Sequence, residues 1–129
     1  MTDTDMTQNT SGMGEKAIVP PTIIDKFNWG AFLCTWIWGI GNKSYITLIS
    51  LVVAFIPMVG ALVNIVLAIW FGIKGNEWAW RNKRFLSLEH FEETQKMWVT
   101  IGIILIILYV VFIVVGMLMF IKAMSSIKV

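Results

Sequence analysis

The stretch MWVTIGIILIILYVVFIVVGMLMFI, residues 97–121, decides the fold class of this chain. It contains 25 residues without a charge, lying between Lys96 and Lys122. A helix needs roughly 20 apolar residues to cross the hydrocarbon core of a bilayer, so this stretch is long enough to span with some tilt. Its apolar residues surround the whole helix rather than forming one stripe, as is typical of a helix in lipid. We therefore predict a transmembrane helix over Trp98–Ile121.

The composition of the whole chain agrees with a membrane protein. Of 129 residues, 57% are hydrophobic and only 14% are charged, with a mean hydropathy of +0.76. A soluble domain of ordinary composition has about 25% charged residues, and a domain this small buries only a modest share of its surface. A single cysteine excludes an intramolecular disulfide, and a net charge of +2 is too small to indicate nucleic acid as a partner. The predicted fold class is an all-α membrane protein.

A second apolar segment, residues 45–73, is interrupted by Pro57, Met58, Val59 and Gly60. As one helix it would be roughly 43 Å long, which exceeds a bilayer core of about 30 Å. Two structures are open: a span kinked at the proline, or a re-entrant hairpin whose arms are residues 46–56 and 61–73. The kinked span is the favoured prediction, because re-entrant backbone needs cover from protein or water.

The segment before it, residues 27–41, is short and rich in tryptophan. As a helix it would rise roughly 22 Å, so it is either a short span or a helix in the membrane interface, where tryptophan is enriched. Asn28 is a plausible N-cap, and Gly39 and Gly41 are plausible terminators. Residues 1–22 are polar and lack apolar periodicity, which predicts a disordered N-terminal tail ending at Pro20-Pro21.

The distribution of lysine and arginine predicts the orientation, because cytoplasmic loops carry an excess of both. Residues 74–97 form the richest segment, with five such residues, and are predicted to be a cytoplasmic connector. Three spans put seven basic residues inside against three outside, and the hairpin puts eight against two. Both arrangements place the N-terminus inside and the C-terminus outside. Two spans with an outer interfacial helix put five basic residues on each side, so the charge rule predicts no orientation for that arrangement.

Small residues recur at every fourth position within the second apolar segment. On a helix they form one stripe, and such stripes let two backbones approach closely, while an amide adds a hydrogen bond between helices. We predict that this stripe is a helix-packing surface, either within the chain or against a second copy or another membrane protein. A similar spacing joins Ala31, Thr35 and Gly39. The predicted helix-packing residues are Gly60, Asn64, Ala68 and Gly72.

The predicted connector carries basic residues beside Trp78 and Trp80. Cations near a membrane surface contribute about 1 kcal/mol each toward anionic lipids, so Arg81, Lys83 and Arg84 are predicted to contact lipid headgroups or to act as ordinary cytoplasmic anchors. Glu77 and Arg81 have the i,i+4 spacing of a surface ion pair, and Ser87 could cap the last helix.

No set of residues in the sequence indicates chemistry. There is one His and one Cys, no Ser–His–Asp set, no glycine-rich phosphate loop, and no Asp, Glu or His inside the apolar segments. We therefore predict no catalytic, cofactor-binding or metal-binding residues.

Two motifs resemble those of a known group. Phe27-Asn-Trp-Gly-Ala-Phe32 and Gly72-Ile-Lys-Gly-Asn-Glu-Trp-Ala-Trp80, followed by Phe91 and Gln95-Lys-Met-Trp98, are similar to small bacterial multi-pass membrane proteins of a family of unknown function. The resemblance covers about residues 27–105. It implies a bacterial inner or plasma membrane and carries over no site residue.

Three functions remain open from the sequence. The first is a non-enzymatic accessory or regulatory membrane protein that acts by helix packing. The second is a bacteriocin-immunity or holin-like membrane factor. The third is a subunit of a transporter or enzyme that depends on a partner. The expected surroundings are the lipid bilayer, with a homo-oligomer or another membrane protein as the partner.

Overall fold

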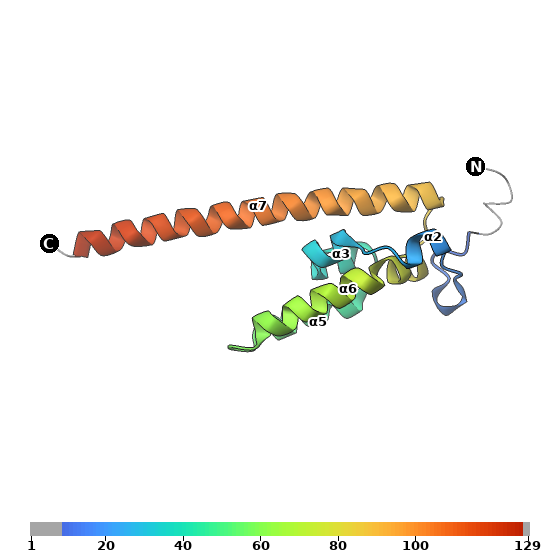
Figure 1. The fold of residues 1–129 in the computed structure, drawn as a ribbon, viewed down its shortest axis with the longest axis horizontal. Helices are drawn as coiled ribbons and strands as arrows, with labels where there is room; N and C mark the ends of the chain where they lie inside the picture. Colours follow the sequence, from blue (N-terminus) through green and yellow to red (C-terminus); the bar gives the residue numbers. More distant parts are fainter. Residues whose placement is uncertain (1–8, 128–129) are drawn as a thin grey trace.

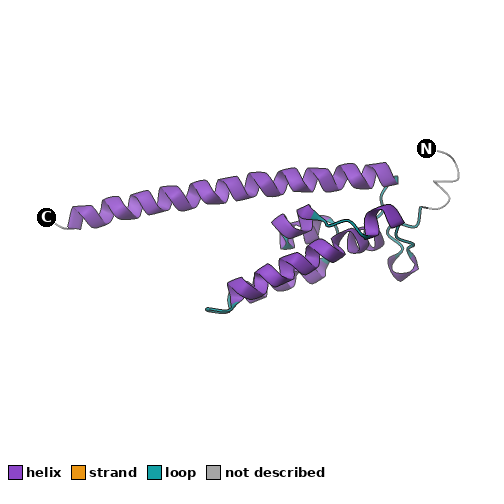
Figure 2. Cartoon of the chain, in the orientation of Figure 1, coloured by secondary structure: helices purple, strands orange, loops and turns teal. Residues whose placement is uncertain are grey.

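The computed structural model describes residues 9–127, and within that range every regular element is a helix (Figure 2). The prediction of an all-α fold is confirmed. Two long helices dominate, and shorter helices gather at one end of them (Figure 1). The elements are η1 (Gly14–Lys16), α2 (Pro21–Ile24), α3 (Trp29–Cys34), α4 (Trp36–Gly41), η2 (Tyr45–Leu48), α5 (Ile49–Ala54), α6 (Gly60–Asn82) and α7 (Leu88–Ile127).

Helix α7 contains the predicted transmembrane segment and extends it in both directions. Its 40 residues correspond to about 60 Å of helix. The first part, through Gly102, packs against the rest of the chain, whereas every described side chain from Ile103 to Ile127 is exposed. Within residues 9–127, α7 is the only helix long and apolar enough to cross a membrane.

The favoured prediction for residues 45–73, one kinked helix, is wrong. The chain ends α5 at Ala54, turns through residues 55–59 and returns as α6. Pro57 lacks an N–H and disfavours a helical conformation in the residue before it, and Met58 adopts a φ of 67° within the turn. Gly60 then lies against Val53, where a Cβ would be 2.5 Å from the Val53 carbonyl oxygen. The reversal predicted for the hairpin is therefore what the structure contains.

The tryptophan-rich segment also differs from a single helix. It forms α3 and α4, separated at Thr35, whose φ of 40° and ψ of −105° are incompatible with a continuous helix. Each helix has six residues, about 9 Å, so the alternative of a short span is wrong. The stripe predicted through Ala31, Thr35 and Gly39 is broken at its middle residue. The predicted N-cap is confirmed, since the Asn28 side chain accepts a hydrogen bond from the Ala31 N–H at 2.8 Å.

The prediction of a disordered tail is wrong for residues 9–22; residues 1–8 lie outside the described range. The backbone of this segment is bound by side chains at the end of α6. Arg81 Nη1 donates to the carbonyls of Gly14, Glu15 and Ala17. Trp80 Nε1 donates to the Ile18 carbonyl at 3.1 Å. A polar segment without its own core is thus ordered by hydrogen bonds to its carbonyl groups.

The predicted connector, residues 74–97, is mostly helical. Helix α6 continues to Asn82 and α7 begins at Leu88, so only residues 83–87 form a loop. Two local predictions here are confirmed. Arg81 pairs with Glu77 at 3.3 Å, and Ser87 Oγ accepts a hydrogen bond from the His90 N–H at 3.0 Å.

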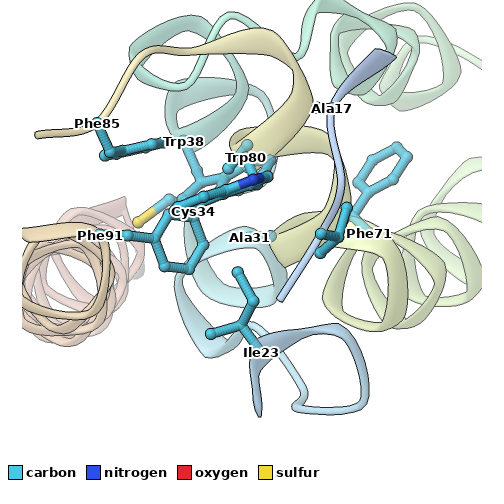
Figure 3. Close-up of a cluster of buried hydrophobic side chains, with 11 residues drawn as sticks. Ala17, Ile23, Ala31, Cys34, Trp38, Phe71, Trp80, Phe85 and Phe91 are labelled. Atoms are coloured by element: carbon cyan, nitrogen blue, oxygen red, sulfur yellow. The ribbon is translucent and has the colours of Figure 1, made fainter. Parts of the chain in front are cut away.

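The core lies where the short helices meet the two long ones, and it is rich in aromatic residues (Figure 3). Trp38, Phe71 and Phe85 are completely buried. We call this part of the molecule the head: residues 9–48 and 70–102. Two apolar arms leave it in the same direction (Figure 1): the hairpin arm, residues 49–69, and the α7 arm, residues 103–127. The core side chains are Ala17, Val19, Ile23, Ala31, Cys34, Trp38, Phe71, Ala79, Trp80, Phe85 and Phe91.

Candidate functional site

The head contains a buried network of carboxamide side chains that no sequence motif indicates. Its members come from the loop before α3, the end of α4, α6 and α7. All are at most 8% exposed, although each carries an amide that would ordinarily be hydrated. The amide members are Asn28, Asn42, Asn76 and Gln95, and the indole of Trp38 completes the network.

Asn28 is the centre of the network. Its Nδ2 donates to Asn76 Oδ1 at 2.7 Å and to Gln95 Oε1 at 2.9 Å, while its Oδ1 caps α3. Its backbone N–H donates to the Gly72 carbonyl at 2.7 Å. One residue thereby joins α3, α6 and α7.

Gln95 extends the network to α4. Its Oε1 accepts a second hydrogen bond from Trp38 Nε1 at 2.9 Å, and its Nε2 donates to Asn42 Oδ1 at 2.9 Å. On the other side, Asn76 Nδ2 donates to the carbonyls of Ile23 and Lys26. Neutral amides do not titrate, so this network positions the helices and carries no acid–base chemistry.

Glycines allow the helices of the head to approach closely enough for these hydrogen bonds. A Cβ on Gly75 of α6 would lie 2.9 Å from the Cβ atoms of both Ala31 and Asn28. A Cβ on Gly102 of α7 would lie 2.7 Å from Leu33 Cβ. Both distances are too short for a side chain, so α3 packs against α6 and α7 through their glycine backbones.

A pocket of about 240 Å³ lies next to the network, between residues 23–29 and α7. Its inner wall includes Asn28, Asn76 and Gln95. Three charged side chains, Lys26, Glu92 and Lys96, line it as well, and among residues 9–127 none of them takes part in an ion pair. The remaining lining residues are Ile23, Phe27, Trp29, Phe91 and Val99.

The predicted helix-packing residues do lie on packed parts of α6. Gly60, Ala68 and Gly72 are buried. Gly60 faces Val53 of α5, and a Cβ on Gly72 would collide with the Phe27 ring at 2.1 Å. Asn64 is different: its Oδ1 is buried without a hydrogen-bond partner in the described part of the chain. It lines a groove of about 210 Å³ together with Thr35, Trp36, Ser50, Leu51 and Ala54.

The basic residues predicted to contact lipid headgroups are engaged within the chain. Arg81 Nη1 donates to the carbonyls of Gly14, Glu15 and Ala17. Arg84 Nη1 donates to the Asn9 carbonyl at 2.7 Å, and Lys83 Nζ donates to the Gly41 carbonyl at 3.1 Å. The N-terminal segment that Arg81 and Arg84 bind lies at the end of the head away from the two arms (Figure 1). Their donors are therefore used to fold the N-terminal segment, and their contact with lipid stays a prediction.

Metal-binding and thiol chemistry find no support in the geometry. Residues 9–127 contain no group of three His, Cys, Asp or Glu side chains arranged to hold a metal ion. Burial raises the pKa of the Cys34 thiol, whose Sγ donates to the Trp98 carbonyl at 3.6 Å. A buried thiol with a raised pKa is poorly nucleophilic.

Comparisons with protein-family models, with curated proteins and with solved structures find no match for this chain.

Proposed function

We propose that this protein is a non-enzymatic integral membrane protein that acts as an accessory or regulatory subunit by packing its apolar helices against a partner. The observation that carries the proposal is the α7 arm: its apolar side chains, from Ile103 to Ile127, are all exposed in the described chain. An apolar surface of this length is stable in lipid or against another apolar surface.

Features of the hairpin arm favour a protein partner in addition to lipid. Phe55 is 86% exposed and Met58 is 97% exposed at its tip. Asn64 Oδ1 lies in this arm without a hydrogen-bond donor among residues 9–127. An unpaired amide oxygen in an apolar surrounding is costly, and amides at such positions form hydrogen bonds between helices in membranes. We propose that a partner helix lying in the groove that Asn64 lines supplies this donor once the amide turns its oxygen toward the groove.

The proposed placement puts the head on the cytoplasmic side, with α7 spanning and the hairpin arm entering the bilayer from the same side. Eight of the ten lysine and arginine residues precede Trp98, and only Lys122 and Lys128 follow it. This distribution favours a cytoplasmic head under the positive-inside rule. The resemblance of the sequence to small bacterial membrane proteins leads us to propose the bacterial inner or plasma membrane.

Cysteine labelling of intact cells tests this placement. Single cysteines replacing Lys43 and Lys83, in a Cys34→Ala background, are expected to be protected from a membrane-impermeant maleimide, while a cysteine at Ile127 reacts. A kinked span would put residue 43 outside and residue 83 inside. Labelling at residue 43 in intact cells would therefore contradict the re-entrant hairpin, and protection at residue 127 would contradict the outside C-terminus.

Photo-crosslinking tests the proposed partner. A photoreactive residue replacing Leu51, which lines the groove beside Asn64, is expected to give a discrete adduct heavier than the monomer in native membranes. Asn64→Leu should reduce the yield about fivefold, because a hydrogen bond between membrane helices contributes about 1 kcal/mol. Ile65→Leu, an exposed neighbour, should leave the yield unchanged. A strict monomer, or an adduct unaffected by Asn64→Leu, would refute the role given to this amide.

A further inference from the structure

We propose that the pocket between residues 23–29 and α7 binds the phosphodiester headgroup of a membrane phospholipid. The inference rests on the proposed membrane placement of α7. The pocket is lined by Lys96 and Val99 on α7, which lie on either side of Met97, where the uncharged run begins. It therefore opens at the level where this helix would pass from water into lipid.

The charges around the pocket match a phosphodiester. Lys26 and Lys96 supply two positive charges and Glu92 one negative charge, which leaves a net charge of +1 beside a group of charge −1. The two lysines make no ion pair within the described residues, so both ammonium groups are free to contact an anion. Asp25 precedes Lys26 in the chain but does not line the pocket.

The apolar lining fits the rest of a lipid molecule. Val99 continues into the exposed apolar surface of the α7 arm, along which an acyl chain could lie. Trp29, at the pocket and 56% exposed, is the residue type that concentrates at the level of the headgroups. The carboxamides of the network are held by one another, so they shape the inner wall while the lysines provide the attraction.

The position of these lysines also distinguishes them from the other basic residues of the head. Arg81 and Arg84 are bound to the carbonyls of the N-terminal segment. That segment lies at the end of the head farthest from the arms (Figure 1). Lys26 and Lys96, by contrast, make no ion pair among residues 9–127 and line a cavity at the start of the apolar run.

Native mass spectrometry of the purified full chain tests this site, with phosphatidylglycerol added over a range of concentrations. We expect one saturable lipid adduct. Lys26→Gln and Lys96→Gln should each weaken its affinity about fivefold, since each cation contributes about 1 kcal/mol near an anionic headgroup. The double variant should weaken it about 25-fold. Glu92→Gln should strengthen binding, because it removes a negative charge, and a merely destabilising change would not do so.

Three results would overturn the headgroup site. They are an unchanged affinity in the double variant, an equal loss in Lys74→Gln, and displacement of the lipid by inorganic phosphate at matched concentrations. Lys74 is the charge-matched control, because it lies on α6 outside the pocket and pairs with Glu77 at 3.4 Å. Displacement by inorganic phosphate would indicate a soluble phosphate ligand instead. Membrane fractionation keeps the two proposals apart: if the wild-type chain is absent from the membrane fraction, the proposed function fails independently of lipid binding.

Discussion

Replacing Gln95 by leucine is expected to lower the free energy of unfolding by about 3–5 kcal/mol, because it leaves three buried polar groups unpaired at about 1–3 kcal/mol each. The orphaned groups are an N–H of Asn28 Nδ2, the Trp38 Nε1–H and the Asn42 Oδ1. Water cannot take the place of Gln95 beside Trp38 and Asn42 without opening the head, since both side chains are completely buried. Equilibrium unfolding in mixed micelles, followed by tryptophan fluorescence, measures the loss.

The matched control for this prediction is Thr100→Val, a polar-to-apolar change one and a half turns further along α7. The Thr100 side chain is exposed and bonds only to the Lys96 carbonyl of its own helix. Surface substitutions of this kind change stability by less than about 0.5 kcal/mol. Equal losses in the two variants would show that the carboxamide network contributes no more than a surface hydroxyl does.

A second large effect is expected for Gly75→Val, at about 3 kcal/mol of destabilisation, the upper end of the range for an overpacked core. The new Cβ would lie 2.9 Å from the Cβ atoms of Ala31 and Asn28 and 3.2 Å from Asn28 Cγ. These atoms are next to the backbone, so α3 must move away from α6 to make room. That movement also lengthens the hydrogen bond from Asn28 Nδ2 to Asn76 Oδ1. The same unfolding measurement detects the loss.

Gly116→Val is the control for the second prediction, since it makes the identical change in the α7 arm. A Cβ at Gly116 would meet no atom within 4 Å, and valine has a slightly better helix propensity than glycine. We expect a change within about 0.5 kcal/mol. If Gly75→Val is no more harmful than Gly116→Val, the close contact between α3 and α6 does not stabilise the head.

Features that depend on nearby residues could be predicted from the sequence. The uncharged, apolar run over residues 97–121 predicted a long apolar helix there, and α7 contains it. Asn28 and Ser87 were identified as caps because the polar side chain and the N–H it binds are only three residues apart. Glu77 and Arg81 paired for the same reason, one helical turn apart.

The candidate site could not be predicted, because its partners are distant in the chain. Asn28 bonds across 48 residues to Asn76 and across 67 to Gln95. An isolated amide in a sequence gives no indication of such a partner. The sequence predicts lipid contacts for Arg81 and Arg84, whereas in the structure both bind backbone carbonyl groups. Every residue has such a carbonyl, so the sequence cannot indicate which of them an arginine binds. The pocket beside Lys26 and Lys96 was missed because it exists only once residues 23–29 lie against α7.

The hairpin was the less favoured of two predictions because proline is compatible with either a kink or a turn. What distinguishes them is the approach of Gly60 to the Val53 carbonyl, a contact that is specified by the absence of a side chain. Glycine at the first position of α6 was instead interpreted as part of a helix-packing stripe. Gly60 does pack against a helix, but that helix is α5 of the same hairpin.

The unbroken course of α7 has a mechanical consequence. The helix runs from Leu88 to Ile127 without interruption, and the head grips its first part through Gln95 and Gly102. In the proposed placement no hinge separates the head from the membrane part of α7. Any tilt of the helix in the bilayer therefore tilts the head by the same angle. A thinner membrane would force a greater lean, and the head would rotate toward the lipid surface with it. The angle between the head and the membrane surface would then change with membrane thickness.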